Sequence, residues 1–332
     1  MGKIVGITYD LKEDWKFKEG DPKDANAELD QPKTIDAIEK ALISSGHKVK
    51  RLGNAFNLLK QINDLGVDIV FNIAEGHRGR NRESQVPNIL EMYDIPFVGA
   101  DALTLGLTLD KIVAKKMFIS EGIPTPKFFA ATGKEDLKKL NTIGYPLIVK
   151  TKHEGSSKGI DKNARVESLE ALKARVKYIN ENYHQVALVE EFIRGTEVTV
   201  PVMGNDNPEA MPVVQVCMDN SVELGDKFYS FERLSVQAAT LTYVCPAKIS
   251  KKLEKQLQEI ALRVYNCVGC RDFGRVDFRI DEKNNPYVLE INPLPCLIPE
   301  DTFGIFPPTI GLTYNDIVNK ILDNALKRYN IL

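Results

Sequence analysis

Two short runs near the end of the chain decide its fold: Gly274-Arg275-Val276-Asp277-Phe278-Arg279-Ile280 and Tyr287-Val288-Leu289-Glu290-Ile291-Asn292-Pro293. Each run alternates polar and apolar residues, which is the period of a half-buried β-strand. Residues 281–286 between them read Asp-Glu-Lys-Asn-Asn-Pro, a turn-forming sequence, so the two runs predict a hairpin. If Ile280 pairs with Tyr287, then Asp277 lies opposite Glu290 and Arg275 lies opposite Asn292.

The polar side chains of this hairpin predict a cation site. Like charges directly opposite each other destabilise a sheet, so Asp277 and Glu290 call for a compensating positive charge. Together with the amide oxygen of Asn292 they form an all-oxygen set that suits Mg²⁺. Arg275 beside them can stabilise charge that develops on a reacting phosphoryl or acyl group. The alternative is an ordinary hairpin with a solvated face, but the apolar neighbours of Glu290 favour the metal site.

Length and composition describe a globular protein with two or three domains. The chain has 332 residues, of which 43% are hydrophobic and 27% are charged. A formal net charge of −2 argues against a dedicated nucleic-acid-binding or membrane-surface protein, and no apolar run is long enough to span a bilayer. Five cysteines without a secretory signal predict reduced thiols and a cytoplasmic location.

The first hundred residues alternate strand and helix signals. The strand-like runs are rich in apolar residues, as in a buried parallel sheet, and the segments between them have helical periodicity. The predicted strands are Ile4–Thr8, Lys48–Leu52, Val67–Ile73 and Ile95–Gly99, and the predicted helices are Thr34–Ser44, Phe56–Leu65 and Gln85–Tyr93. This βαβαβ order predicts an open, doubly wound sheet.

The rest of the chain predicts α+β structure. A helix over Asp110–Glu121 ends at Gly122 with Pro124 beyond it, which is a common way for a helix to stop. Helices and strands then mix, and strands dominate from Thr196 onward. The further predicted elements are strands Lys127–Ala131, Tyr145–Lys150, Val186–Ile193, Glu197–Met203, Met211–Met218 and Leu241–Val244, with helices Lys134–Leu140, Ser168–Tyr183 and Leu253–Tyr265.

A buried strand that ends in Lys150 leads directly into a glycine- and serine-rich loop, Thr151–Ile160. The small residues Gly155, Ser156 and Ser157 offer free backbone N–H groups and hydroxyls, and such a loop can close over phosphates. It is not a Walker loop, because the glycine spacing differs and Lys-Ser/Thr does not follow. A flexible surface loop would look similar, but the position after a strand ending in lysine favours phosphate binding.

Two further segments carry charged residues at the ends of elements. In Val189–Glu197, acidic residues follow a buried strand. Backbone groups at the end of a strand can form hydrogen bonds with the edge of an adenine ring, and a carboxylate there can accept hydrogen bonds from ribose hydroxyls. Solvated acids at a strand terminus are the simpler interpretation of this segment by itself. Asp110 can cap the following helix, and Lys111 in its first turn is disfavoured by the helix dipole, which invites an anionic partner such as a phosphate. An exposed lysine is the alternative.

Together these segments resemble the ATP-grasp superfamily and, within it, the D-alanine–D-alanine ligase family. The resemblance runs from about Pro87 to Tyr329 and is specific because seven motifs recur in order. They are Leu109-Asp110-Lys111, then Ile148-Val149-Lys150 with Glu154-Gly155-Ser156-Ser157, Val189-Glu190-Glu191, Glu197-Val198-Thr199-Val200, Tyr243-Val244-Cys245-Pro246-Ala247, Gly274-Arg275-Val276-Asp277 and Leu289-Glu290-Ile291-Asn292-Pro293.

The resemblance implies an ATP-grasp fold in which a doubly wound N-terminal domain (residues 1–103) precedes two α+β domains (104–192 and 193–332) that sandwich ATP. It also implies a role for each motif. Lys111 and Lys150 would contact the ATP phosphates, and the loop with Glu154, Gly155, Ser156 and Ser157 would cover them. Adenine would be held by Glu190, Glu191, Phe192 and Ile193, and ribose by Glu197. Two Mg²⁺ ions (or Mn²⁺) would be bound by Asp277, Glu290 and Asn292, and Arg275 would steady the reacting carboxyl-phosphate group.

The same family links a carboxylate to an amine: ATP phosphorylates the carboxylate and the amine then attacks the acyl phosphate. This chemistry needs positioning and charge neutralisation more than a protein nucleophile.

The family pattern fails where substrates would be recognised. The N-terminal signature is missing, and the first strand leads instead into a polar insertion that ends at Asp30. After the third strand, the loop carries His77, Arg78, Arg80 and Arg82, which could bind a substrate carboxylate or equally form a solvated loop. Cys296 stands where the ligases usually place a glycine, and its side chain should reshape the pocket for the second substrate.

The main hypothesis is therefore an ADP-forming ligase that joins amino acids or a small peptide, with small molecules as its partners. Two alternatives stay open, namely a true D-alanine–D-alanine ligase of cell-wall synthesis and a non-catalytic ATP-binding regulatory protein. The presence of Arg275, Asp277, Glu290 and Asn292 speaks against the non-catalytic alternative. The resemblance also leaves a homodimer open, and the sequence does not define the substrates or their chirality.

Overall fold

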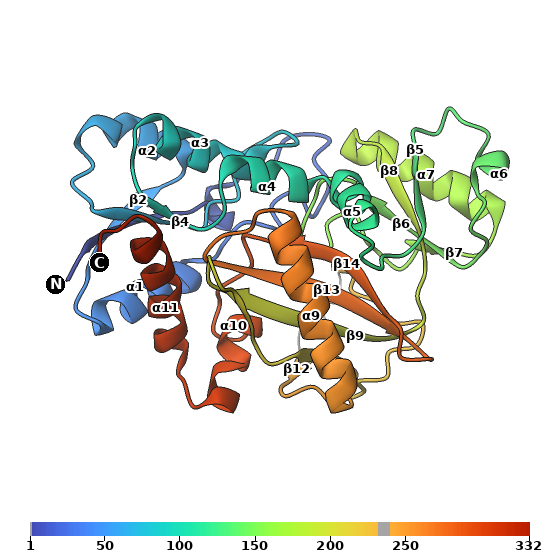
Figure 1. The fold of residues 1–332 in the computed structure, drawn as a ribbon. Helices are drawn as coiled ribbons and strands as arrows, with labels where there is room; N and C mark the ends of the chain where they lie inside the picture. Colours follow the sequence, from blue (N-terminus) through green and yellow to red (C-terminus); the bar gives the residue numbers. More distant parts are fainter. Residues whose placement is uncertain (1, 232–239) are drawn as a thin grey trace.

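The computed structural model describes residues 2–231 and 240–332, and its strands form three separate sheets (Figure 1). The first sheet is parallel, with strand order β2-β1-β3-β4. Its strands are β1 (Ile4–Thr8), β2 (Lys48–Gly53), β3 (Ile69–Asn72) and β4 (Phe97–Val98). Short buried strands of Val, Ile and Phe suit a parallel sheet that is covered on both faces.

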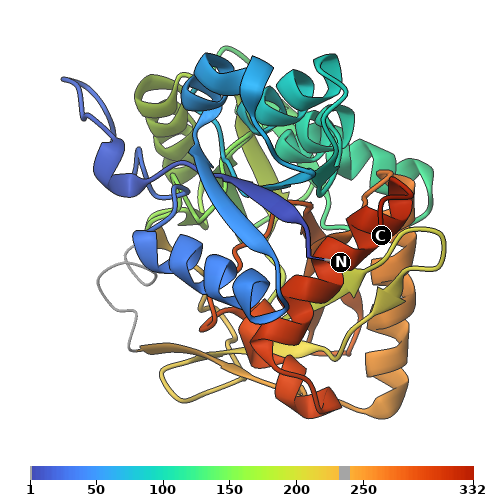
Figure 2. The same ribbon diagram turned by 90° about the vertical axis from the view of Figure 1, so that its left-hand side faces the viewer.

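Helices cover both faces of the first sheet, as the doubly wound prediction requires. Apolar residues of α1 (Pro32–Ser44) and α11 (Tyr314–Arg328) bury one face, and those of α2 (Ala55–Gln61) and α3 (Gln85–Met92) bury the other. The C-terminal helix thus returns to the N-terminal sheet, and Figure 2 shows α11 beside α1. In α11, buried residues recur at the spacing of one helical face, which explains this packing.

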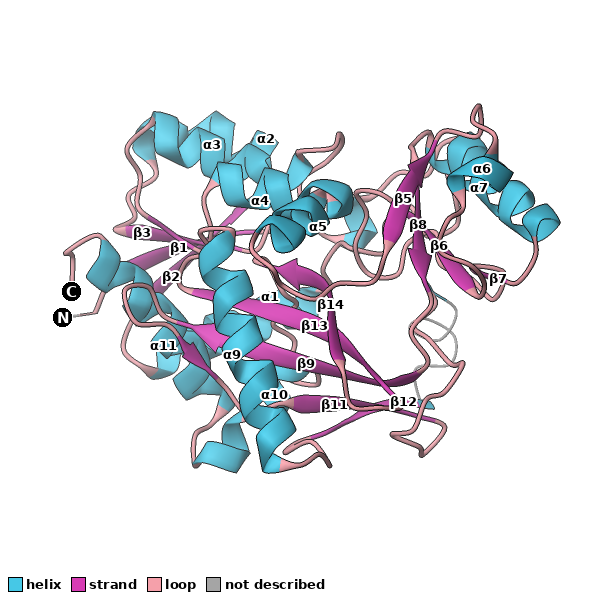
Figure 3. Cartoon of the chain, turned by 45° about the vertical axis from the view of Figure 1, so that its right-hand side comes forward, coloured by secondary structure: helices cyan, strands magenta, loops and turns pink. Residues whose placement is uncertain are grey.

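The second sheet is antiparallel, with strand order β5-β8-β6-β7. Its strands are β5 (Phe128–Ala131), β6 (Leu147–Thr151), β7 (Arg165–Val166) and β8 (Ala187–Glu191). The helix α7 (Leu169–Tyr183) and the short α6 (Leu137–Leu140) pack on one side of it. Figure 3 shows this sheet as a unit beside the larger third sheet.

The third sheet follows the order β12-β11-β9-β13-β14, with β10 paired to β9. Its strands are β9 (Gly195–Met203), β10 (Glu209–Ala210), β11 (Val214–Met218), β12 (Leu241–Val244), β13 (Phe273–Asp281) and β14 (Pro286–Asn292). The long helix α9 (Lys251–Cys267) covers one face of the sheet, and α5 (Lys111–Ser120) packs beside it (Figure 1). The short α10 (Thr302–Ile305) follows the hairpin.

The predicted pairing within the hairpin is confirmed for its polar residues. Asp277 pairs with Glu290, and Arg275 pairs with Asn292. The assumed partner of Ile280 is wrong, because Ile280 pairs with Pro286 rather than Tyr287. A register shift between Asp277 and Phe278 leaves one extra residue on β14, and such a bulge shifts the register on one side of it alone.

The sequence patterns do not predict α4 (Ala102–Leu109), a helix that begins at the side-chain cap of Asp101. Its glycine and two threonines lower the helix propensity of so short a segment. Contacts to distant residues support it instead, since the Thr104 hydroxyl donates to the Val268 carbonyl at 3.0 Å. Tertiary contacts override a weak local preference here.

The division into three domains stays a prediction. The predicted boundary after residue 192 falls between β8 and β9, whereas the boundary after residue 103 falls inside α4. None of the helices within residues 2–231 and 240–332 combines the length and the apolar character that crossing a membrane would need.

Candidate active site

A large cavity of about 730 Å³ lies where the second and third sheets face each other, with part of the first sheet's loops at one end. Sixteen of the twenty residues predicted from the sequence line it. They are Lys111, Lys150, Glu154, Gly155, Ser156, Ser157, Glu190, Glu191, Phe192, Ile193, Glu197, Arg275, Asp277, Glu290, Asn292 and Cys296. Segments that are far apart in the sequence thus meet in one space, and their individual roles stay predictions.

Asp277 is the centre of a polar network on the hairpin wall. Arg275 donates to both of its carboxylate oxygens, at 2.9 and 3.0 Å. The Thr199 hydroxyl and the Asn292 amide donate to it at 2.6 and 2.9 Å. Burial lowers the pKa of Arg275, but Asp277 and Asp301 outweigh burial and hold that pKa well above its usual value. The arginine therefore keeps its charge beside the carboxylate.

Glu290 lies opposite Asp277 and forms an ion pair with Lys111 at 2.8 Å. Burial raises the pKa of Glu290, but the positive charge of Lys111 outweighs burial and lowers it overall, so the carboxylate stays ionised. Lys111 also donates to the Glu154 carbonyl at 2.7 Å. This lysine consequently connects the hairpin wall to the loop that follows β6.

The donor set of the hairpin fits Mg²⁺. Two carboxylates and one amide lie on adjacent strands and line the same cavity, and hard cations in such sites also take waters and phosphate oxygens as ligands. Within the described part of the chain, no three or more His, Cys, Asp or Glu side chains gather as a candidate metal site.

Glu190 bridges two lysines at the end of β8. Its two oxygens lie 2.7 Å from Lys115 Nζ and 2.7 Å from Lys150 Nζ. Burial raises the pKa of Glu190, but the two ammonium groups outweigh burial and lower it to about 2. Two positive charges face one negative charge, so a net positive charge remains at the cavity wall where Lys150 lies.

Lys115 was not among the predicted site residues, although its side chain is only 1% exposed. It lies one helical turn after Lys111 on α5, so the spacing alone could have drawn attention to it. Its burial depends on the packing of α5 against the sheets, and a sequence pattern does not reveal that.

Arg279 is a second functional residue that sequence reasoning missed. It is buried and donates to the carbonyls of Ile193, Gly225 and Lys227, each at 3.0 Å. It also lies 3.1 Å from Glu197, whose pKa is raised by burial against the opposing effect of Arg279. The strand period does place Arg279 on the same face as Arg275 and Asp277, which was the available signal.

None of the four predicted residues of the loop after β3 lines the cavity. His77, Arg78 and Arg80 are exposed, and His77 packs near the rings of Trp15 and Phe56. Arg80 lies 3.6 Å from Asp110. Arg82 is buried and paired with Glu28, so it acts inside the protein rather than at the cavity surface.

Comparison with known proteins agrees with this geometry. A family model described as the C-terminus of D-ala D-ala ligase matches residues 117–323. The D-alanine–D-alanine ligase of Carboxydothermus hydrogenoformans is 33% identical over 298 residues, which cover 87% of this chain and 91% of that protein. An uncharacterized protein of Sinorhizobium fredii, y4sG, is 36% identical over 264 residues, which cover 79% of this chain and 75% of that protein.

Solved structures share the fold along the whole chain. The D-alanine–D-alanine ligase of Bacillus anthracis complexed with ATP aligns with a TM-score of 0.77 at 19% identity, covering 99% of each chain. The VanG D-Ala:D-Ser ligase of Enterococcus faecalis aligns with a TM-score of 0.75 at 21% identity, covering 98% of this chain and 100% of that one. The predicted ATP-grasp fold is confirmed. The chain therefore belongs to the D-alanine–D-alanine ligase-like family of ATP-grasp enzymes, which are ATP-dependent, ADP-forming ligases.

Proposed function

We propose that this protein joins the carboxylate of one amino acid or small peptide to the amine of another, with ATP as the source of activation. The observation that supports this most is the meeting of two lysines, an arginine and the Asp277–Glu290 pair in one cavity. A carboxylate and a phosphate repel each other, and only a site rich in fixed positive charge brings them together.

The reaction would proceed in two displacements. A carboxylate oxygen of the first substrate attacks the γ-phosphorus of ATP, which forms an acyl phosphate and releases ADP. The amine of the second substrate then attacks the acyl carbon, and phosphate leaves as the amide bond forms. Neither step requires a nucleophile from the protein, so its contribution is to orient the reactants and to compensate charge.

Each charged residue has a place in this scheme. Lys111 and Lys150 hold the phosphates, because both lysines line the cavity. Glu190 orients Lys150, and Arg275 stabilises the negative charge of the group being transferred. Asp277, Glu290 and Asn292 would hold Mg²⁺, which supplies additional positive charge on the phosphate oxygens.

The far end of the cavity suits the nucleoside. Phe192 offers an apolar surface, and the arginines Arg165 and Arg279 lie over its ring at 5.1 and 5.3 Å. Glu197, held by Arg279, faces the cavity and can accept hydrogen bonds from ribose hydroxyls. This end therefore offers the groups that a nucleoside would contact.

The relatives suggest the substrates to try first. Two of them are named for joining D-alanine to D-alanine or D-serine, so D-alanine is the first candidate for the activated substrate. Cys296 lines the cavity where those ligases usually place glycine, and it would narrow the pocket for the amine substrate. Because of this side chain, we expect the protein to use a substrate pair other than two D-alanines.

A panel of D- and L-amino acids tests the proposal. Purified protein is incubated with ATP, Mg²⁺ and pairs of amino acids, ADP release is followed, and products are identified by mass spectrometry. We expect ADP release together with an amide product for at least one pair. ATP binding without turnover across the panel would favour a regulatory protein, and formation of D-alanyl-D-alanine would identify a true D-alanine–D-alanine ligase.

A further inference from the structure

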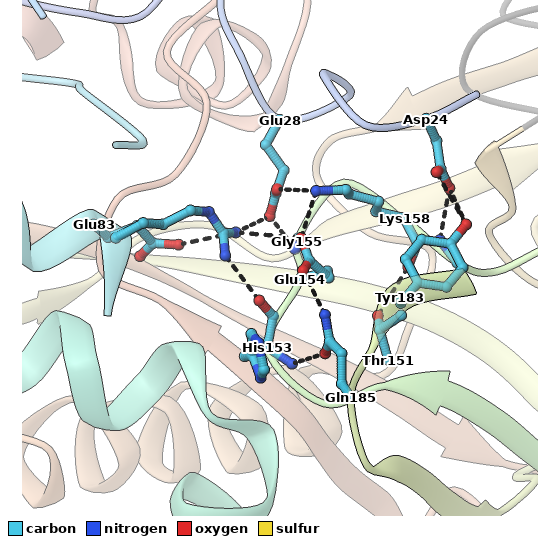
Figure 4. Close-up of polar contacts among 12 residues, drawn as sticks. Asp24, Glu28, Glu83, Thr151, His153, Glu154, Gly155, Lys158, Tyr183 and Gln185 are labelled. Carbon is cyan, nitrogen blue, oxygen red and sulfur yellow. Dashed lines mark hydrogen bonds and ion pairs between the residues drawn. The ribbon is translucent and has the colours of Figure 1, made fainter. Parts of the chain in front are cut away.

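The polar insertion after β1 folds into a closed loop that lies against the phosphate loop. Its ends are joined, because the backbone of Lys12 donates to Asp30 at 2.9 Å and that of Asp30 donates to Asp10 at 2.9 Å. From this base, residues 24–28 reach the segment Glu154–Gly159 (Figure 4). We call residues 11–30 the strap and Glu154–Gly159 the phosphate loop.

Asp24 anchors the C-terminal end of the phosphate loop. It is 5% exposed and accepts a hydrogen bond from the Gly159 amide at 2.7 Å. The Tyr183 hydroxyl donates to the same carboxylate at 2.9 Å, and Figure 4 shows the two side chains together. Burial and the charge of Asp24 raise the pKa of Tyr183, so the phenol keeps its proton and remains a donor.

Gly159 fits this anchor because it has no side chain. Its φ is +76°, a conformation that favours glycine, and an added Cβ would lie 2.5 Å from Thr151 Cγ2 and 3.3 Å from Tyr183 Cζ. The close approach of Tyr183 and the strap therefore depends on this glycine.

Glu28 anchors the other end of the phosphate loop. It accepts a hydrogen bond from the Gly155 amide and pairs with Arg82, and it lies 3.4 Å from Lys158 Nζ. Burial raises the pKa of Glu28, but Arg82 and Lys158 outweigh burial and lower it overall, so the carboxylate is ionised. Arg82 also donates to the His153 carbonyl at 2.9 Å, just before the loop begins.

The backbone between the two anchors is strained. Ser156 and Ser157 have φ values of 46° and 56°, in the left-handed region that residues with a Cβ rarely adopt. Such a conformation persists only where the surroundings determine it. Both residues line the cavity, so the strained turn faces the space assigned to the phosphates.

We propose that Asp24 and Glu28 are positioning residues, which hold the phosphate loop closed over the reacting phosphates and so keep water away from the acyl phosphate. The proposal rests on the proposed function, because it names what the closed loop protects. Asp24 does not line the cavity, so its effect must pass through Gly159. When the loop opens, water replaces the amine as the nucleophile, and the acyl phosphate returns to free carboxylate and phosphate.

Four variants test the anchor at Asp24. Asp24→Ala removes both contacts, Tyr183→Phe removes one, and Asp24→Asn keeps an acceptor for the Gly159 amide. Asp21→Ala is the matched control, since Asp21 also belongs to the strap but its carboxylate accepts a hydrogen bond from the nearby Lys18 amide, at 2.9 Å. Tyr183→Phe keeps the ring packing, and it replaces Asp24→Ala as the test variant if Asp24→Ala fails to fold.

The first readout is hydrogen exchange of the peptide covering residues 152–160, without nucleotide. We expect exchange in Asp24→Ala to rise about tenfold, since a hydrogen bond to a charged group stabilises by at least about 1.4 kcal/mol. Exchange in Tyr183→Phe and Asp24→Asn should rise less than in Asp24→Ala, and exchange in Asp21→Ala should remain near wild type. Unchanged exchange in Asp24→Ala would overturn the proposal, whatever reaction the protein catalyses.

The second readout is the number of ADP molecules released per amide bond formed. A variant that merely unfolds in part loses both products equally and keeps this ratio, whereas an opened loop raises it. We expect the ratio and the KM for ATP to rise about tenfold in Asp24→Ala and to return toward wild type in Asp24→Asn. A constant ratio would overturn the proposal that Asp24 holds the loop closed. Absence of turnover in the wild-type protein would instead refute the proposed function, and the hydrogen-exchange result would then decide about the anchor by itself.

Discussion

The cavity has two sides that are built in different ways. The hairpin side takes its functional residues from regular strands, where Arg275, Asp277 and Arg279 follow each other at a spacing of two. The strap side takes them from loops, and its contacts join residues far apart in sequence, such as Glu28 with Gly155 and Asp24 with Gly159. Local periodicity thus encodes the chemistry of this enzyme, while long-range contacts encode the closure of its site.

The largest expected effect is on the hairpin side. Asp277→Ala or Glu290→Ala removes a carboxylate from the proposed cation site, and we expect turnover to fall by about 1000-fold or more, since a bound metal contributes several kcal/mol to such reactions. ADP release at saturating ATP measures the loss, with circular dichroism as the test of folding. Asp281→Ala is the matched control, because Asp281 ends β13 of the same hairpin, does not line the cavity and accepts a hydrogen bond from the Asn285 amide. Rates unchanged from wild type would contradict the metal assignment.

Lys115 gives the next largest effect. Among the described residues, Lys115→Met leaves Glu190 with Lys150 as its one remaining ion-pair partner, so the net positive charge at the phosphate end disappears. We expect the KM for ATP to rise about 10- to 100-fold and stability to fall by about 3 kcal/mol, as for other broken buried pairs. Lys116→Met is the control, because Lys116 is the exposed neighbour on the same helix.

A double-mutant cycle separates charge from packing in this result. If Lys115 acts by compensating Glu190, then Lys115→Met should have little effect on ATP binding in a Glu190→Gln background. Isothermal titration with ATP measures the four affinities. An equal loss in both backgrounds would mean that Lys115 acts on ATP binding independently of Glu190.

The hairpin also shows how far a local pattern can be trusted. The alternation of polar and apolar residues predicted that Asp277 faces Glu290, and the structure confirms it. The same pattern missed the bulge, although Val288 and Leu289 are two apolar residues in succession and thereby break the alternation. The polar pairs lie on one side of the bulge, so the error in register did not reach them.

The residues that sequence reasoning missed share one property. Lys115, Arg279 and Asp24 carry charges that look solvated in the sequence, and each is 5% exposed or less in the structure. Whether a charge is buried depends on which elements pack together, and the partners of Asp24 lie more than a hundred residues away. The seven motifs, in contrast, each lie within ten consecutive residues of the chain, so they could be recognised without knowledge of the packing.

A smaller effect is expected on stability at the base of the strap. Burial raises the pKa of Asp30 from 3.8 to about 7, against weaker opposing effects of Thr34 and Lys12. Between about pH 4 and pH 7 the unfolded chain has lost this proton while the folded protein keeps it, so this group's contribution to stability falls as pH rises. Asn cannot ionise, and the stability of Asp30→Asn relative to wild type should therefore grow across this range and level off above it. Urea unfolding from pH 4 to pH 8 measures it, and a difference independent of pH would contradict the burial of this carboxylate.

The smallest effect should come from the exposed arginines of the loop after β3. They test whether the loop after β3 takes part in binding the substrate. The sequence suggested that Arg78 and Arg80 bind a substrate carboxylate, but neither lines the cavity. We expect Arg78→Ala and Arg80→Ala to keep kcat and the KM for the amino acids within about twofold, as is usual for exposed positions. Arg82→Met should instead lower stability, because it leaves Glu28 buried without its closest cation. A rise in the substrate KM confined to Arg78→Ala or Arg80→Ala would place recognition in this loop. It would then mean that this loop folds over the cavity when substrate binds.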